Sequence, residues 1–131
     1  MTNLFKYYRP AILWALFILI MCSIKLGAVS NSPMFFPGFD KLVHCGFFFV
    51  FVILSFYGVL RQQIVARVPY KAVLLIIAVA ILYGGVIELL QLWIFTWRSG
   101  EWGDLFADAV GASMAGFGIL LTVYGMRYAK K

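Results

Sequence analysis

The side chains that could do chemistry in this chain are few, and several recur one helical turn apart. Asp40 and His44 are spaced i and i+4, and His44 is the single histidine. A helix would place both on one face. A carboxylate beside an imidazole is used in proteins for proton transfer or metal binding. The structural alternative is that Asp40 caps a helix and His44 is an interfacial residue.

Two further pairs share helical faces. Glu88 and Gln91 are spaced i and i+3, and Asp104 and Asp108 are spaced i and i+4. Asp104 suits a helix N-terminus, where the macrodipole favours an anion, but capping does not explain Asp108. Like charges one turn apart repel each other. The Asp104–Asp108 pair is therefore easier to keep if a cation lies between the carboxylates or a proton is shared.

The composition indicates where these residues must be positioned. The chain has 131 residues, of which 64% are hydrophobic and 12% charged, whereas a soluble domain has about 25% charged residues. Such a chain cannot cover a soluble surface, so it belongs in a bilayer, with membrane lipids as partners. The net charge of +6 is explained by basic residues at helix ends, as membrane insertion requires, and we expect no nucleic-acid partner.

Four apolar runs are long enough to cross the hydrocarbon layer. They cover about residues 10–29, 42–60, 72–95 and 105–124. None shows the alternation of a barrel strand, so we predict an all-α, four-helix transmembrane bundle. The spans use nearly the whole chain, and residues 1–131 form one domain. Cys22 and Cys45 fall inside apolar runs, where thiols are usually packing residues.

The charges predict an orientation. All five carboxylates lie near the same ends of the spans. Most basic residues lie at the opposite ends: Lys6, Arg9, Arg61, Arg67, Lys71, Arg127, Lys130 and Lys131. The positive-inside rule places these ends, and both termini, in the cytoplasm. As an alternative for the first span, Lys6, Arg9, the apolar run and residues 28–30 resemble a cleaved signal peptide, although the run is long for one.

Glu88 is the most demanding of the carboxylates. It lies about 24 Å along its helix from Ala72, at about 1.5 Å per residue, which is inside a hydrocarbon core roughly 30 Å thick. An unpaired carboxylate there is costly or becomes protonated. We expect Lys25 or Arg98 to compensate it, either as a structural ion pair or as part of a functional site.

Shared depth and shared helical faces predict that the polar residues converge in one outward-opening pocket. The expected binding residues are Asp40, Lys41, His44, Glu88, Gln91, Arg98, Asp104 and Asp108. With one histidine in the chain, we expect no metal site, and the sequence indicates no cofactor.

The set of motifs resembles the VanZ-like family. The matching residues are Asp40-Lys41-x-x-His44, Glu88-x-x-Gln91, Arg98 and Asp104-x-x-x-Asp108-x-x-Gly111, within residues 40–116. The resemblance implies a small, multi-pass protein of the bacterial plasma membrane. It also implies low-level resistance to the glycopeptide teicoplanin for the family's founder, without a settled reaction. The family commonly has Asn where this chain has Asp108, so a hydrogen-bonding role there becomes titratable.

Three functions fit these features. The first is a cell-envelope protein that binds a lipid head group, a lipid-linked envelope precursor or a glycopeptide, with the apolar stretch at residues 33–39 against the ligand's tail. The alternative is an enzyme acting on a lipid-linked substrate at the outer leaflet. There His44 would be the acid or base, Asp40 its orienting group, Glu88 a second acid or base and Arg98 an anion clamp. No G-x-S-x-G or H-E-x-x-H motif supports catalysis. Conduction fits least, because the polar residues stop at one layer. The oligomeric state is not indicated.

Overall fold

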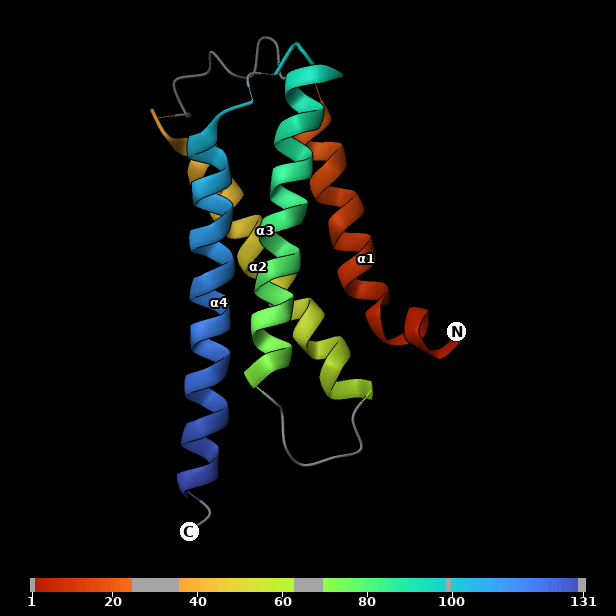
Figure 1. Ribbon diagram of the computed structural model, residues 1–131, viewed down its shortest axis with the longest axis vertical. Helices are drawn as coiled ribbons and strands as arrows, with labels where there is room; N and C mark the ends of the chain where they lie inside the picture. Colours follow the sequence, from red (N-terminus) through yellow and green to blue (C-terminus); the bar gives the residue numbers. More distant parts are fainter. Residues whose placement is uncertain (1, 25–35, 63–69, 99, 130–131) are drawn as a thin grey trace.

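The computed structural model describes residues 2–24, 36–62, 70–98 and 100–129. These residues form four helices: α1 (Thr2–Ser23), α2 (Phe39–Gln62), α3 (Tyr70–Trp93) and α4 (Trp102–Ala129). All four are long and apolar enough to cross a membrane. Among the described residues, the predicted all-helical fold with four helices of membrane-spanning length is confirmed, and Figure 1 shows the helices running alternately up and down.

The helices extend beyond the predicted spans at most ends. α1 begins at Thr2 and includes Pro10, and α4 continues to Ala129. Apolar runs mark only the hydrocarbon layer, whereas helical hydrogen bonding continues through the interfacial turns. α3 instead ends at Trp93, because the next two amides both donate to the carbonyl of Leu90 and turn the chain away. Residues 25–35, including Lys25 and the first three residues of the apolar 33–39 stretch, lie outside the described residues.

The central packing contact is between α2 and α4, with α1 against α2 and α3 against α4. In Figure 1, α1 and α3 end at the top, where α2 and α4 begin, and both termini lie toward the bottom. Consequently, the C-terminal turns of two helices and the N-terminal turns of the other two meet at one end of the bundle. We call it the acidic end, because Asp40 and Asp104 lie in the first turns of α2 and α4.

Small residues on α4 allow this close packing. Ala112 and Ala115 are buried, as are Gly111 and Gly116. A Cβ at Gly111 would collide with the backbone carbonyl of Cys45 on α2, and one at Gly116 would collide with Ile77 on α3. This small-residue face of α4 is therefore the surface that α2 and α3 approach.

Below the acidic end the bundle is apolar inside and outside. The core includes Ile18, Phe48, Val52, Val73 and Ile87, each almost fully buried. Many large hydrophobic side chains are exposed around it, as expected for helices that face lipid. Two aromatic side chains with polar groups are hydrogen-bonded in this region. Trp14 Nε1 donates to the Phe47 carbonyl (2.9 Å), and the Tyr83 hydroxyl donates to the Ala15 carbonyl (2.6 Å).

We expect Gly111→Ala to destabilise the bundle by roughly 1–3 kcal/mol, because the added methyl group must push α4 away from α2. The matched control is Gly118→Ala in the same helix, where a Cβ meets no atom within 4 Å. That change should be neutral or gain up to about 1 kcal/mol of helix propensity. Thermal unfolding of the purified protein in detergent measures both, and equal effects of the two variants would contradict the close α2–α4 contact.

Candidate functional site at the acidic end

A buried imidazole and carboxylate join α2 to α4 at the acidic end. His44 Nδ1 lies 2.9 Å from Asp108 Oδ1, and the two residues are 2% and 0% exposed. The carboxylate that His44 contacts is thus on another helix. The carboxylate of Asp40, one turn away on α2, instead lies 3.8 Å from Lys41 Nζ. The close approach of α4 at Gly111 brings Asp108 to the imidazole.

The second nitrogen of His44 faces two other groups. Nε2 lies 3.9 Å from Asp104 Oδ2 and 4.0 Å from Cys22 Sγ. The imidazole therefore lies beside both carboxylates of the i, i+4 pair on α4. This position agrees with the expectation that a group able to carry positive charge lies between the Asp104 and Asp108 carboxylates.

Lys41 forms the rim of the site. Its Nζ lies 2.8 Å from Glu101 Oε2 and 3.4 Å from Asp104 Oδ1. The lysine side chain is 41% exposed, so these ion pairs are partly screened by solvent. A Cβ at Gly103 would lie 2.7 Å from Lys41 Cε, and the glycine thus leaves space for the lysine to reach across α4.

Glu88 obtains its partner from the backbone. The Glu101 amide donates to Glu88 Oε2 at 2.8 Å, and Glu88 is 4% exposed. We expected Lys25 or Arg98. Lys25 lies outside the described residues, and within the described ranges Arg98 has no carboxylate within ion-pair distance. The connection between α3 and α4 instead approaches the backbone of α3, since a Cβ at Gly100 would lie 2.9 Å from the Glu88 carbonyl.

Gln91 and Trp97 attach the end of α1 to the site. Gln91 Nε2 donates to the Cys22 carbonyl and Trp97 Nε1 to the Ser23 carbonyl, each at 2.9 Å. The last carbonyls of a helix lack partners within the helix, so these two side chains satisfy the C-terminal turn of α1. Gln91 was among the expected binding residues, whereas Cys22 and Glu101 were not, although Glu101 belongs to the carboxylate layer that was expected to converge.

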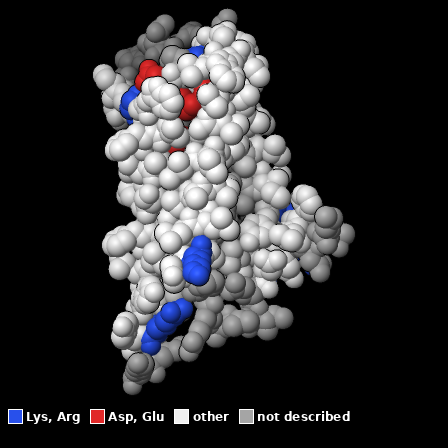
Figure 2. Space-filling view, viewed as in Figure 1, with Lys and Arg blue, Asp and Glu red and all other residues white. Residues whose placement is uncertain are grey.

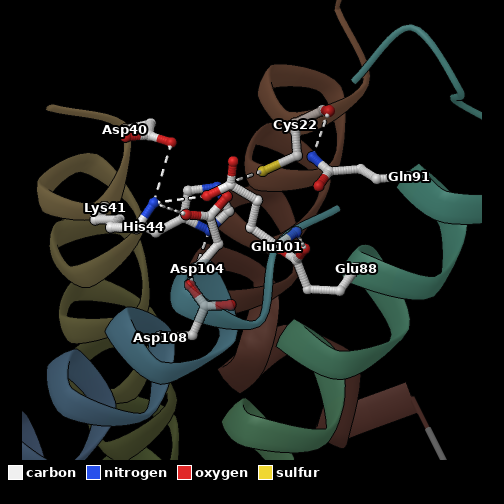
Figure 3. A network of polar contacts seen from close by, with 9 residues as sticks. All are labelled: Cys22, Asp40, Lys41, His44, Glu88, Gln91, Glu101, Asp104 and Asp108. Carbon is white, nitrogen blue, oxygen red and sulfur yellow. Dashed lines mark hydrogen bonds and ion pairs between the residues drawn. The ribbon is translucent and has the colours of Figure 1, made fainter. Parts of the chain in front are cut away.

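Figure 3 shows how these side chains converge from all four helices and from the connection before α4. In Figure 2, the acidic atoms on the visible face gather at this end, beside a basic side chain and among uncharged ones. Of the eight predicted binding residues, the structure joins all but Arg98 in this arrangement through contacts between described residues.

Buried oxygens without a hydrogen-bond partner are the most unusual feature of the site. Among described residues these are Glu88 Oε1, Gln91 Oε1, Asp104 Oδ1 and Asp108 Oδ2. Asp104 Oδ1 does lie 3.4 Å from Lys41 Nζ, at ion-pair distance, so its charge is partly compensated. Each buried acceptor left without a partner costs roughly 1–3 kcal/mol. The arrangement can therefore gain free energy by accepting hydrogen-bond donors or a cation.

Two groups of side chains have the proximity that a cation requires. One donor atom each from His44, Glu88 and Asp108, all buried, lie within 4.8 Å of one another, and so do atoms of Asp40, Glu101 and Asp104. We call the first the inner group and the second the rim group.

Comparisons with known proteins add no family assignment. No protein-family model matches the chain, and no curated protein or solved structure matches it significantly.

The backbone partner of Glu88 leads to a prediction that separates charge from hydrogen bonding. Glu88→Gln keeps an oxygen that can accept from the Glu101 amide, so we expect thermal stability close to that of the wild type. Glu88→Leu removes the acceptor and leaves that amide without its partner, which should cost roughly 1–3 kcal/mol. Equal destabilisation by both variants, measured by thermal unfolding in detergent, would instead indicate that an ion pair holds Glu88.

Proposed function

We propose that this chain is a multi-pass protein of the bacterial plasma membrane. In this proposal the acidic end faces outward and binds the polar head group of an envelope lipid or lipid-linked envelope precursor. The observation that carries it is the set of buried, unpartnered oxygens gathered at one end of a membrane bundle. Polar groups left in this state are expensive, and a head group that donates hydrogen bonds or brings a cation would satisfy them.

The charge distribution supports the orientation. Among described residues at the end opposite the site, Lys6, Arg9, Arg61, Lys71 and Arg127 are basic, and the acidic residues lie at the other end. Short cytoplasmic segments carry such an excess of lysine and arginine. Both termini and the segment between α2 and α3 are then cytoplasmic.

The surroundings of the site support an amphiphilic ligand. The rim combines Lys41, which is partly exposed, with exposed aromatic side chains, among them Phe36, Trp97 and Trp102. Tryptophan is enriched at the level of lipid head groups, so a head group could reach the site while its tail stays in the outer leaflet. The resemblance to VanZ-like proteins supports a contribution to glycopeptide resistance.

Catalysis on a lipid-linked substrate is the second candidate, and the His44–Asp108 pair favours it. An imidazole that is oriented by a buried carboxylate is suited to acid or base chemistry. Here Asp108 would orient His44, in place of Asp40, and Glu88 would be the second acid or base. His44 is 2% exposed, so the reacting bond of a substrate would have to enter between the helices, whereas a bound head group can also contact the partly exposed Lys41 at the rim.

Topology is tested with reporters. We expect a fluorescent protein that folds only in the cytoplasm to be active when fused after Ala129, and alkaline phosphatase, active only outside, to be active when fused after Thr96. The two fusions control for each other because α4 separates their positions. The reverse pattern would place the site in the cytoplasm and contradict the proposed ligand.

The role of the site is tested in bacteria whose glycopeptide resistance is raised by the wild-type chain. We expect His44→Asn to lower resistance to the level of cells without the chain, because Asn cannot reach both Asp108 and Asp104. Gln62→Ala, at the opposite end of α2, is the control, and immunoblots establish equal amounts in the membrane. Full resistance with His44→Asn would exclude a role of the site in resistance.

A further inference from the structure

We propose that the inner group, His44, Glu88 and Asp108, binds one divalent metal cation. The three residues come from α2, α3 and α4 respectively. Their donor atoms lie within 4.8 Å of one another, and the residues are 2%, 4% and 0% exposed. From the sequence we expected no metal site, because the chain has a single histidine. In the structure, two carboxylates from other helices complete a set of three ligands with that histidine.

Unpartnered oxygens in the inner group point to a missing cation. Glu88 and Asp108 each use one carboxylate oxygen in a hydrogen bond, while Glu88 Oε1 and Asp108 Oδ2 have no such partner among described residues. The backbone of α3 leaves room for the free oxygen of Asp108. A Cβ at Gly84 would lie 2.5 Å from Oδ2, and the glycine thus allows this oxygen to stay beside α3.

Charge balance favours a cation with two charges. The inner group contains two carboxylates, and Asp104 lies 3.9 Å from the imidazole. Among the described residues, the lysine that pairs with this layer is Lys41, and it contacts the rim carboxylates. Buried carboxylates without compensation are strongly unfavourable. A divalent cation would neutralise the two inner carboxylates, and a bound proton is the competing explanation that the experiment must exclude.

The donor atoms indicate the class of metal. Carboxylates suit Mg²⁺, Ca²⁺ and Mn²⁺, whereas imidazole suits Zn²⁺, Fe²⁺ and similar ions. A mixed set favours a transition-metal dication such as Mn²⁺ or Zn²⁺. With metal–ligand bonds of about 2.0–2.2 Å, neighbouring ligands of one ion lie roughly 3–3.5 Å apart. The inner group would therefore need only a small inward movement to coordinate the ion, and further positions would remain for water or a ligand.

A bound cation would also indicate which kind of head group the proposed site could bind. The acidic end as described would repel a phosphate or pyrophosphate head group, and a dication with open positions would attract one. This extension rests on the proposed function, whereas metal binding itself does not. The test therefore uses the metal alone, and a chain that binds metal but affects no envelope property would overturn only the proposed function.

The experiment is a titration of purified, chelator-treated full-length protein in detergent with Mn²⁺, with free Mn²⁺ measured by electron paramagnetic resonance. We expect saturation at one ion per chain. Glu88→Gln and Asp108→Asn should each weaken binding by roughly tenfold or more, the scale seen even for residues that only support a metal ligand. Absence of saturable binding by folded wild-type protein would overturn the proposal and leave a proton as the compensating charge.

Two controls keep the result specific. Gly84→Ala should weaken Mn²⁺ binding by displacing Asp108, and Gly85→Ala should not, because a Cβ there meets no atom within 4 Å. Equal effects of the two would overturn the role of Asp108. Asp40→Asn tests the rim group, in which Asp40 lies close to Glu101 and Asp104. A loss of binding with Asp40→Asn but not with Glu88→Gln would overturn the inner site in favour of the rim.

Discussion

Three buried carboxylates at one end of a membrane bundle set the main physical constraint on this structure. Asp104, Asp108 and Glu88 are at most 4% exposed, and the charged form of each is expensive away from water. The described groups that compensate them are the His44 imidazole, the rim lysine Lys41 and the backbone amide of Glu101. Much of the helix packing at this end brings these three groups close to the carboxylates.

The helix packing follows from that need. An imidazole on α2 can reach a carboxylate on α4 only if the two helices are close, and Gly111 permits this by letting the Cys45 carbonyl approach. Gly84 and Gly103 act similarly, since each leaves space for a polar side chain, Asp108 or Lys41. Glycines that would otherwise weaken a helix are thus placed where polar side chains or a backbone must come close.

The sequence predicted the fold and the layer of the site better than the pairings within it. The lengths of the apolar runs were enough to predict four helices, because the thickness of the hydrocarbon layer sets the length of a membrane span. The partner of His44 depended on the distance between helices, which the i, i+4 spacing of Asp40 does not encode. The partner of Glu88 is a backbone amide, which carries no residue-type signal, and so the sequence suggested Lys25 or Arg98 instead. Glu101 could have been included in the site, because it belongs to the same acidic layer.

The His44–Asp108 contact is the interaction that joins the two central helices inside the polar layer. A double-mutant cycle with His44→Ala, Asp108→Ala and the double variant, followed by thermal unfolding in detergent, measures it most directly. Residues in direct contact show coupling of roughly 0.5–3 kcal/mol. Since the two atoms lie 2.9 Å apart in a buried site, we expect favourable coupling of at least about 1 kcal/mol. Additive effects of the two substitutions would show that the imidazole and carboxylate do not meet, and would contradict this account of the site.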